Sequence, residues 1–415
     1  MSAEPHHGLH RDTFALVLAG GRGSRLHELT GHRAKPAVPF AGSMRIIDFV
    51  LGNCVNSGIR RIGVLTQYKA QSLIRHVERG WGFLEASLGE FVDVVPAQQQ
   101  RGEGWYCGTA DAVFQNLDIL REVAPRHVLV LAGDHVYKMD YGVMLAEHVA
   151  RGAVLTVACV EVPLEAASGL GVMSVDADDR VNAFAEKPAS PAALPGRPGR
   201  ALASMGIYAF DAAFLVAALE RDAADLGSSH DFGRDLIPAA VAAGRVHAHR
   251  FERSCVNMVE GRPYWRDVGT LDAYWEANLD LTQVVPELNL YDDAWPLPAR
   301  QPSRPPARFV FDEAGRRGSA VDSLVSGGCI VSGAEVRRSL LFHGVRVEEG
   351  SRIEESVLLP QVRVGRGVHL RRAIVDRLCV LPDGLQVGID AAADRARFRI
   401  SERGIALVTA EMLAR

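Results

Sequence analysis

The sequence predicts an α/β protein, with a mostly parallel sheet in a first domain and a parallel β-helix in a second. Three observations favour this fold class. Between residue 13 and about residue 285, short apolar runs alternate with helix-like stretches. A proline-rich stretch then interrupts the pattern, and beyond it aliphatic residues recur at every sixth position. With 415 residues, the chain is long enough for two or three domains.

The apolar runs of the first domain are typical of buried strands. The runs "FALVLA", "RIGVLT", "HVLVLAGD" and "VLTVACVEV" are apolar at nearly every position. Strands of this kind are covered on both faces, as in the parallel sheet of an α/β fold. We therefore predict a flexible N-terminus at residues 1–12 and an α/β domain at residues 13–285.

A stiff linker separates this domain from the second one. The stretch "PLPARQPSRPPARF" carries five prolines, so we place a linker at residues 286–308 and a second domain at residues 309–415. In the second domain, aliphatic residues at six-residue spacing form the rows Ile330, Val336 and Phe342; Val347 and Ile353; Leu358, Val364 and Leu370; and Val362, Val368, Ile374 and Val380. Such hexads are typical of a hexapeptide β-helix. An antiparallel sandwich with similar turn spacing is the alternative.

Composition limits the classes of function. Hydrophobic residues make up 48% of the chain and the formal net charge is −4, which argues against a general binder of nucleic acid or membrane surfaces. The six cysteines form no C-x-x-C pair, which argues against a disulfide framework or a zinc site. The chain has no apolar run long enough for a membrane span and no secretion signal at its N-terminus, so we expect a cytoplasmic protein.

A glycine-rich, cationic stretch, "LAGGRGSRLHELTGHRAKPA", follows the first apolar run. A dinucleotide fold would require a third glycine where Leu26 stands, and no G-x-x-x-x-G-K-[ST] P-loop occurs. The remaining possibility is a loop that wraps a triphosphate about to be cleaved. Gly21 and Gly23 allow close approach of the backbone, while Arg25 and Lys35 can neutralise charge on departing pyrophosphate.

This stretch and the residues after it resemble the N-terminal signature of sugar-nucleotide pyrophosphorylases. The residues after it read "VPFAGSMRIIDFVLGNCVNSGIRRIGVLTQY". "GWYCGTADAV" and "LASMGIYAF" narrow the resemblance to bacterial glucose-1-phosphate adenylyltransferases. "LVLAGDHVYKMDY", "FAEKP", "SSHDFGRDLIP" and "PYWRDVGTLDAYWEANLDL" follow in the order that this family shows, so the resemblance covers nearly the whole chain.

The resemblance implies a Rossmann-like nucleotidyltransferase (GT-A-like) domain followed by a left-handed β-helix. It implies transfer of the adenylyl group of ATP to α-D-glucose 1-phosphate, giving ADP-glucose and pyrophosphate. In this family the reaction is the allosterically regulated first step of bacterial glycogen synthesis, carried out by homotetramers. A pyrophosphorylase that uses UTP or dTTP, a catalytically silent regulatory subunit and a hexapeptide acyltransferase stay as alternatives.

Two aspartates are the candidate metal ligands. Asp134 is the last residue of the run "HVLVLAGD", at the sheet edge where open α/β folds bind ligands. The resemblance makes Asp134 a Mg²⁺ ligand, with Asp267 as its partner, and Mg²⁺ the cofactor. The catalytic residues are then Arg25, Lys35 and Asp134, whereas His135 is expected to be a packing residue because Mg²⁺ prefers oxygen.

The resemblance also assigns the two substrate sites. Lys187 in "FAEKP" is expected to hold the phosphate of glucose 1-phosphate and Glu186 the sugar hydroxyls, with Gly171, Ser204 and Tyr106 completing that site. The nucleotide is expected at Gly20, Gly21, Gly23, Gly108 and the amides from Gln98 to Gln100. Trp105 could instead be a core residue. Cys107 stands where many relatives carry arginine, which puts the coupling between effector and active site in doubt.

Three arginines match positions that contact anionic effectors in the enteric-type enzymes: Arg33, Arg45 and Arg377. Yet His32 stands where those enzymes carry an activator-binding lysine, and Pro39 replaces a histidine. We therefore expect phosphorylated metabolites as effectors, with a weak response to fructose 1,6-bisphosphate and weak inhibition by AMP. Ordinary salt bridges between the two domains are the alternative role for these arginines.

Overall fold

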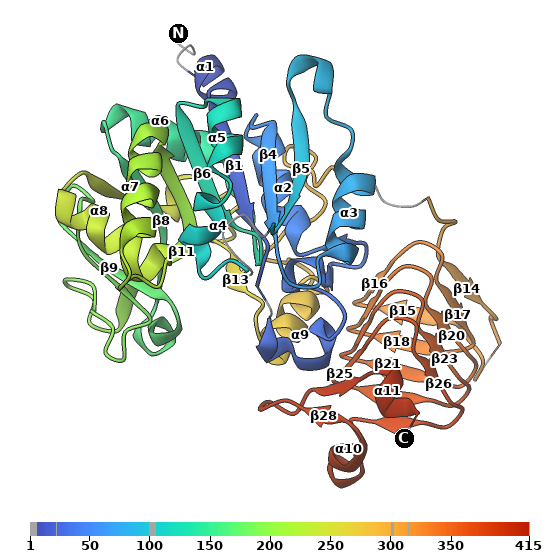
Figure 1. Ribbon diagram of the computed structural model, residues 1–415. Coiled ribbons are helices and arrows are strands. Elements are labelled where there is room, and N and C mark those ends of the chain that lie inside the picture. The colour runs from blue at the N-terminus through green and yellow to red at the C-terminus, as the bar shows by residue number, and fades with distance from the viewer. Residues whose placement is uncertain (1–5, 22, 99–104, 300–302, 314, 415) are drawn as a thin grey trace.

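The structure is a computed structural model that describes residues 6–21, 23–98, 105–299, 303–313 and 315–414. An α/β domain and a parallel β-helix lie side by side, joined near helix α9 (Leu271–Asp280) (Figure 1). The predicted fold class is confirmed for both domains. The predicted N-terminal segment contains helix α1 (His6–Arg11), and the exact domain boundaries stay predictions.

The large sheet of the first domain is parallel on one side and antiparallel on the other. Its strands run in the order β10-β9-β11-β6-β1-β4-β5, with β8 and β12 joined through β11. The pairs β6–β1, β1–β4 and β4–β5 are parallel, whereas β11 is antiparallel to β6, β8 and β9. The strands are β1 (Thr13–Leu18), β4 (Arg61–Thr66), β5 (Phe91–Pro96), β6 (His127–Ala132), β8 (Leu155–Pro163), β9 (Gly171–Val175), β10 (Val181–Glu186), β11 (Arg200–Asp211) and β12 (Val246–Arg250).

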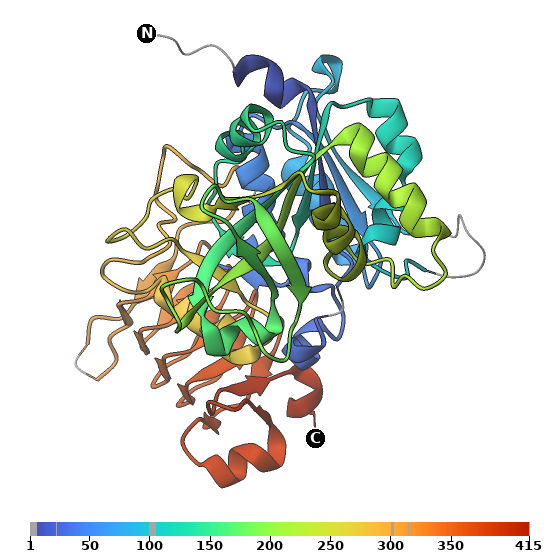
Figure 2. The ribbon, with the colours of Figure 1, turned by 90° about the vertical axis from the view of Figure 1, so that its left-hand side faces the viewer.

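Helices cover both faces of this sheet, which explains why its strands are apolar at nearly every position (Figures 1 and 2). Along β1, Phe14 and Leu16 face one buried cluster, while Ala15 and Val17 face another. The helices on the first face are α4 (Thr109–Phe114), α5 (Leu117–Val123), α7 (Ala212–Ala224) and α8 (Ile237–Ala243). Those on the second face are α2 (Ile47–Asn56), α3 (Gln71–Trp81) and α6 (Tyr141–Ala150).

Short elements complete the first domain at the ends of these strands. They are η1 (Ser24–Thr30), η2 (Lys35–Ala37), β2 (Pro39–Phe40), β3 (Met44–Arg45), η3 (Ala86–Leu88), β7 (His135–Tyr137), η4 (Leu164–Gly169), η5 (Phe232–Leu236), η6 (Phe251–Arg253) and β13 (Trp265–Asp267). Of these, η1, η2 and β13 carry Arg25, Lys35 and Asp267 of the candidate site, and η5 begins at Phe232, which lines its cavity.

The second domain is a three-sided parallel β-helix. Its first face is made of β14 (Arg308–Val310), β17 (Ile330–Ser332), β20 (Arg346–Val347), β23 (Arg363–Val364) and β26 (Val380–Leu381). Its second is made of β15 (Ser319–Val321), β18 (Glu335–Arg337), β21 (Arg352–Glu354), β24 (His369–Arg371) and β27 (Gln386–Val387). Its third is made of β16 (Leu324–Val325), β19 (Leu340–Leu341), β22 (Val357–Leu358), β25 (Ala373–Val375), β29 (Ala406–Val408) and β28 (Arg399–Ile400). Helices α10 (Ala391–Arg397) and α11 (Ala410–Leu413) lie near its C-terminal end (Figure 1).

One predicted row of the β-helix is wrong at its end. Val380 is 63% exposed, and the neighbouring Leu381 points inward at 1% exposure. Val347, Val364 and Leu381 stack in register, so one turn here takes 17 residues and not three full hexads. A strict six-residue spacing therefore slips by one position per turn. For the same reason Val331, and not Ile330, is the fully buried residue of β17.

The two domains share an apolar interface. Leu26, Phe49 and Tyr274 of the first domain belong to one buried cluster with Phe342 and Leu407 of the β-helix. Polar contacts surround it: the Trp275 indole donates to the Glu355 carbonyl at 2.7 Å, and Arg399 makes two contacts of 2.6 Å with Glu28. The proline-rich stretch also packs against the first domain, since the Asn56 side-chain amide donates to the Pro296 carbonyl at 2.7 Å.

Across the described parts of the chain, no helix has both the length and the apolar character that a membrane span requires.

Candidate active site

The candidate site lies at the carboxyl edge of the parallel strands, beside β1 and β6. These two strands end together, with Leu18 opposite Ala132. The glycine-rich stretch leaves β1 at this edge and Asp134 leaves β6. Because β4 and β6 flank β1 on opposite sides, this edge is the switch point at which α/β sheets bind ligands.

A charged cluster joins three of the predicted residues. The Lys35 Nζ atom lies 3.0 Å from Asp134 Oδ2 and 2.6 Å from Asp267 Oδ1. Asp267 reaches the cluster because β13 pairs with β7 and places it opposite His135, the neighbour of Asp134. Arg25 approaches Asp267 at 3.4 Å but is mostly exposed. The cluster therefore combines residues that are far apart in the sequence.

The cluster keeps its members ionised at neutral pH. Burial raises the pKa of Asp134, but nearby positive charge, chiefly that of Lys35, and the hydrogen bonds to the carboxylate together outweigh burial and lower that pKa to about 2. Lys35 lowers the pKa of Asp267 against burial in the same way. Burial would lower the pKa of Lys35, yet the two carboxylates raise it. Lys35 is therefore a charged lysine with 4% of its surface exposed.

Gly23 is required by the packing of this lysine. Its φ of +63° is left-handed, and a Cβ atom there would lie 2.8 Å from Lys35 Cβ. The glycine therefore lets the stretch after β1 fold back over the lysine.

A cavity of about 440 Å³ opens beside the cluster. Predicted nucleotide and sugar residues line it together: Gly20, Gly21, Tyr106, Gly108, Asp134, Glu186 and Lys187. Gly23, Arg25, Lys35, Gln98, Gly171, Ser204 and Asp267 are not in its wall as the structure describes it. A single cavity thus reaches from the glycine-rich stretch to the "FAEKP" segment.

Glu186 and Lys187, the predicted sugar-phosphate residues, both line this cavity. Lys187 Nζ lies 3.1 Å from Glu186 Oε1, and the lysine side chain is more than half exposed. A Cβ at Gly171 would lie 2.9 Å from Glu186 Oε2, and one at Gly233 would lie 2.5 Å from the same atom. Gly171 therefore makes room for Glu186 and is not itself part of the wall.

Ser204 lies behind the cavity wall and does not line the cavity. It lies on β11, where the register with β8 shifts, and its Oγ accepts from the Gly206 N–H at 3.2 Å. It also hydrogen-bonds the hydroxyl of Tyr208, which lines the cavity. Ser204 is thus placed to orient Tyr208.

The predicted adenine loop is described only in part. Gln98 is exposed, whereas Gln99, Gln100 and Gly104 lie outside the described residues. The Tyr106 hydroxyl accepts from Asn116 Nδ2 at 2.9 Å, and burial raises the pKa of Tyr106. Trp105 is 56% exposed, so the alternative of a core residue is wrong.

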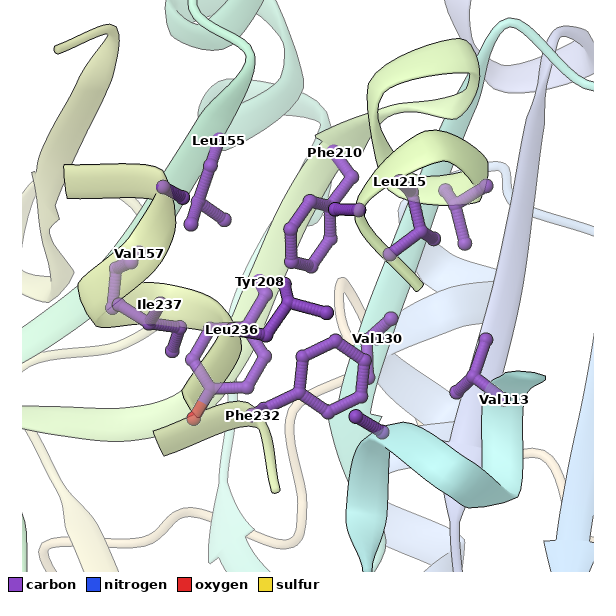
Figure 3. Close-up of a cluster of buried hydrophobic side chains, with 14 of the residues drawn as sticks. Val113, Val130, Leu155, Val157, Tyr208, Phe210, Leu215, Phe232, Leu236 and Ile237 are labelled. Atoms are coloured by element: carbon purple, nitrogen blue, oxygen red, sulfur yellow. The ribbon is translucent and has the colours of Figure 1, made fainter. Parts of the chain in front are cut away.

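Several wall residues have no individual assignment from the sequence: Gln67, Thr109, Tyr208, Asp231 and Phe232. Asp231 and Phe232 belong to the segment "SSHDFGRDLIP", whose resemblance to the family was the available signal. Figure 3 shows the rings of Phe232 and Tyr208 beside each other in the buried cluster. Their centroids lie 5.8 Å apart.

The three predicted effector arginines meet in a second cavity, of about 180 Å³, between the domains. Arg33, Arg45 and Arg377 line it with His343. Arg33 is buried and donates to both oxygens of Asp376 at 2.9 and 3.0 Å, which is an interdomain salt bridge as the alternative expected. Its Nε and Nη1 atoms are buried without a partner in the part of the chain that is described.

The other two arginines behave differently. Arg45 donates to the main-chain carbonyls of Ala37 and Ser72 at 3.2 and 3.0 Å, and no interdomain salt bridge of Arg45 or Arg377 occurs among the described residues. Burial lowers the pKa of Arg45 to about 10, with the charges of Arg33 and Arg377 adding to the effect. Burial and Arg33 also lower the pKa of Arg377.

The residues that depart from the family pattern lie around these sites. His32 is exposed and lies 3.3 Å from Glu411 of helix α11, and Pro39 lines the second cavity. Cys107 is exposed, and its N–H donates to Asp111 Oδ2 at 2.8 Å. The cysteine therefore keeps the main-chain anchor of its loop without supplying a cation.

The arrangement is that of a nucleotidyl transferase, and residues 14–284 match the family model described by that name. Residues 305–408 match a GlmU-like C-terminal hexapeptide model. The chain is 62% identical to the glucose-1-phosphate adenylyltransferase of Nitrosospira multiformis, over 97% of this chain and 95% of that protein. It is 58% identical to the enzyme of the same name from Rhodospirillum rubrum, over 97% and 96%. The chain belongs to the glucose-1-phosphate adenylyltransferase family.

Proposed function

We propose that the protein transfers the adenylyl group of ATP to α-D-glucose 1-phosphate, producing ADP-glucose and pyrophosphate. The observation that carries this proposal is the Lys35–Asp134–Asp267 cluster at one side of a cavity that also reaches Glu186 and Lys187. The names of its relatives support the choice of substrates. The intact cluster argues against a catalytically silent subunit.

The reaction is an in-line attack of a phosphate oxygen on the α-phosphorus of ATP. Because the attacking phosphate is already an anion, no general base is needed. The obstacle is repulsion between two polyanions, and it is overcome by alignment and by positive charge near the departing pyrophosphate. Lys35 is fixed between two carboxylates for this purpose, while the mostly exposed Arg25 is free to move onto phosphate oxygens.

The donor set fits Mg²⁺. Asp134 and Asp267 are hard oxygen ligands, both ionised, and both are within reach of one ammonium group. No group of three or more His, Cys, Asp or Glu side chains suited to a metal occurs among the described residues, so substrate phosphates would complete the coordination. When bound, Mg²⁺ supplies charge neutralisation at the phosphates.

The sugar phosphate is oriented by residues at the other end of the cavity. Lys187 can leave Glu186 and bind the phosphate, because its side chain is more than half exposed. Glu186, held in place between Gly171 and Gly233, then accepts from sugar hydroxyls. The glycine-rich stretch and Gly108 leave room for the nucleotide on the opposite side.

Regulation and assembly are part of the same proposal. A cavity with three arginines suits a phosphorylated metabolite, and it lies where the β-helix meets the first domain. We infer an allosteric, homotetrameric enzyme of glycogen synthesis in the cytoplasm. This inference rests on the family and on the charge of the cavity.

The test is pyrophosphate release from glucose 1-phosphate with Mg²⁺ and, in turn, ATP, UTP, dTTP, CTP and GTP. We expect turnover with ATP far above that with any other nucleotide. Equal rates with UTP or dTTP would favour the alternative pyrophosphorylase, and no turnover with any nucleotide would favour the regulatory subunit.

A further inference from the structure

The segment "SSHDFGRD" holds a histidine in an unusual backbone conformation. His230 has a φ of +56°, in the left-handed region that non-glycine residues seldom adopt. A conformation of this kind persists only where surrounding contacts enforce it.

A closed set of side-chain contacts enforces it here. The His230 Nδ1–H donates to Asp222 Oδ2 at 2.9 Å, and the Ser228 hydroxyl donates to the other oxygen of Asp222 at 2.7 Å. The His230 N–H in turn donates to Ser228 Oγ at 2.9 Å. Asp222 lies near the end of helix α7, so the histidine is tied to a rigid element of the fold.

The main chain of His230 supports the nucleotide side of the cavity. Its carbonyl accepts from the N–H groups of Ala110 and Asp111, at 2.9 and 3.2 Å, in the first turn of helix α4. A Cβ at Gly108 would lie 2.2 Å from that carbonyl oxygen, so this close approach requires glycine. The position of Gly108 in the cavity wall therefore depends on where the His230 carbonyl points.

The residues that follow His230 contact both sides of the cavity, the nucleotide side through Thr109 and the sugar side through Glu186. Asp231 Oδ2 accepts from the Thr109 hydroxyl at 2.9 Å, and the Phe232 N–H donates to the same hydroxyl oxygen at 3.0 Å. Phe232, which lines the cavity, is buried against Tyr208 (Figure 3). Gly233 packs so closely on Glu186 that a Cβ there would lie 2.5 Å from the carboxylate.

We propose that His230 is a positioning residue that couples the two substrate sites. Its imidazole, held by Asp222, fixes the backbone turn that carries Asp231 and Phe232, while its carbonyl fixes the loop at Gly108. A substrate that orders one side of the turn thereby orders the other side, so ATP and glucose 1-phosphate strengthen each other's binding. This proposal rests on the proposed function, because it requires both substrates to occupy this cavity.

The test measures binding and not turnover. A non-hydrolysable α,β-methylene analogue of ATP is titrated by calorimetry with and without saturating glucose 1-phosphate, in the presence of Mg²⁺. In the unsubstituted protein we expect the sugar phosphate to tighten the analogue by at least about fivefold. In His230→Ala the ratio should fall toward one, and the KM of each substrate should rise by about tenfold.

Two further variants distinguish the role of the His230 imidazole from the role of its left-handed backbone conformation. His230→Asn should restore part of the coupling, since asparagine tolerates a left-handed φ and its amide can donate to Asp222. His230→Gly relieves the strain but lacks the ring, so it should fold and still lose the coupling. Asp322→Ala is the matched control, because Asp322 is an exposed residue of the β-helix with a φ of +48°. Its coupling should stay at the unsubstituted value.

Absence of coupling in the unsubstituted protein, or full coupling in His230→Gly, would overturn the proposal. Thermal unfolding of each variant reports whether the fold is intact. Failure of the proposed function is recognised separately, since it appears as absent turnover of the unsubstituted protein with all five nucleotides.

Discussion

The cavity beside Lys35 and the cavity beside Arg33 differ in the sign of the charge that the chain leaves uncompensated. In the first, Lys35 sits between Asp134 and Asp267, and its pKa is raised. In the second, three arginines face one another, and only Arg33 has a carboxylate partner within the described residues. Burial, with the charge of Arg33 added to it, lowers the pKa values of Arg45 and Arg377.

A buried cation therefore has a different meaning in the two places. Where carboxylates surround it, the cation is already stabilised, and the site retains oxygen atoms for a metal ion. Where cations surround it, the charge is costly until an anion arrives, so the protein gains free energy when it binds one. The charge balance around a residue, more than its type, distinguishes the reaction site from the candidate effector site.

The largest effect is expected when the charge balance around Lys35 is changed. Asp134→Asn keeps the shape of the side chain but removes one of the two charges that hold Lys35 and the candidate metal. We expect kcat to fall on the order of 10²–10⁴-fold, because the lost charge acts chiefly in the transition state. Pyrophosphate release at saturating substrates measures it.

The matched control for Asp134→Asn is Asp118→Asn, an exposed position on helix α5, which should retain full activity. Both variants should unfold within a few degrees of the unsubstituted protein. A rise in KM at unchanged kcat would contradict a role in the transition state.

A smaller and more selective effect is expected at the sugar end. Lys187→Ala should raise the KM for glucose 1-phosphate by about tenfold, through loss of one charged hydrogen bond, and change the KM for ATP much less. Steady-state kinetics with each substrate varied in turn measures both values. Arg197→Ala removes an equally exposed cation, which pairs with Glu161 at 2.6 Å, and should change neither. If Lys187→Ala disturbed only ATP, the two substrate sites would have to be exchanged.

The sequence predicted the strands of the first domain better than those of the β-helix. The strands of the first domain were predictable because a sheet covered on both faces favours apolar residues at nearly every position, as Phe14 to Val17 illustrate. The hexads of the β-helix predicted its strands, but the 17-residue turn displaced Val380 to the surface. Small changes in turn length leave little trace in a periodic pattern.

The site residues were predictable as types, and their arrangement was not. The sequence placed Asp134 at the end of a strand, but only the pairing of β13 with β7 brings Asp267 to it. Nothing in the sequence indicates that Lys35 is buried between both carboxylates. Asp231 and Phe232 line the cavity through a left-handed turn at a histidine, a conformation that residue type does not predict.

The smallest expected effect concerns the second cavity. An anion would relieve the repulsion among Arg33, Arg45 and Arg377, so we expect activation by a sugar phosphate or another small phosphorylated acid. The cavity has a volume of only about 180 Å³, and this small size favours a ligand with one phosphate. His32 is paired with Glu411 and lies outside the cavity wall, so it adds little attraction for a second phosphate. The response to fructose 1,6-bisphosphate and the inhibition by AMP should therefore be weak.

An effector screen at fixed, subsaturating ATP measures this response. Arg45→Ala should abolish activation and leave the rate without effector nearly unchanged, because the hydrogen bonds of the Arg45 guanidinium among the described residues go to main-chain carbonyls of its own domain. Arg33→Ala should also abolish it, and in addition destabilise the interface by leaving Asp376 unpaired. The matched control is Arg403→Ala, which removes an interdomain contact of 3.0 Å with Glu276 away from the cavity and should keep the activation. Strong activation by fructose 1,6-bisphosphate that survives both Arg33→Ala and Arg45→Ala would mean that the effector binds elsewhere, and that the positive charge of this cavity serves only to join the domains.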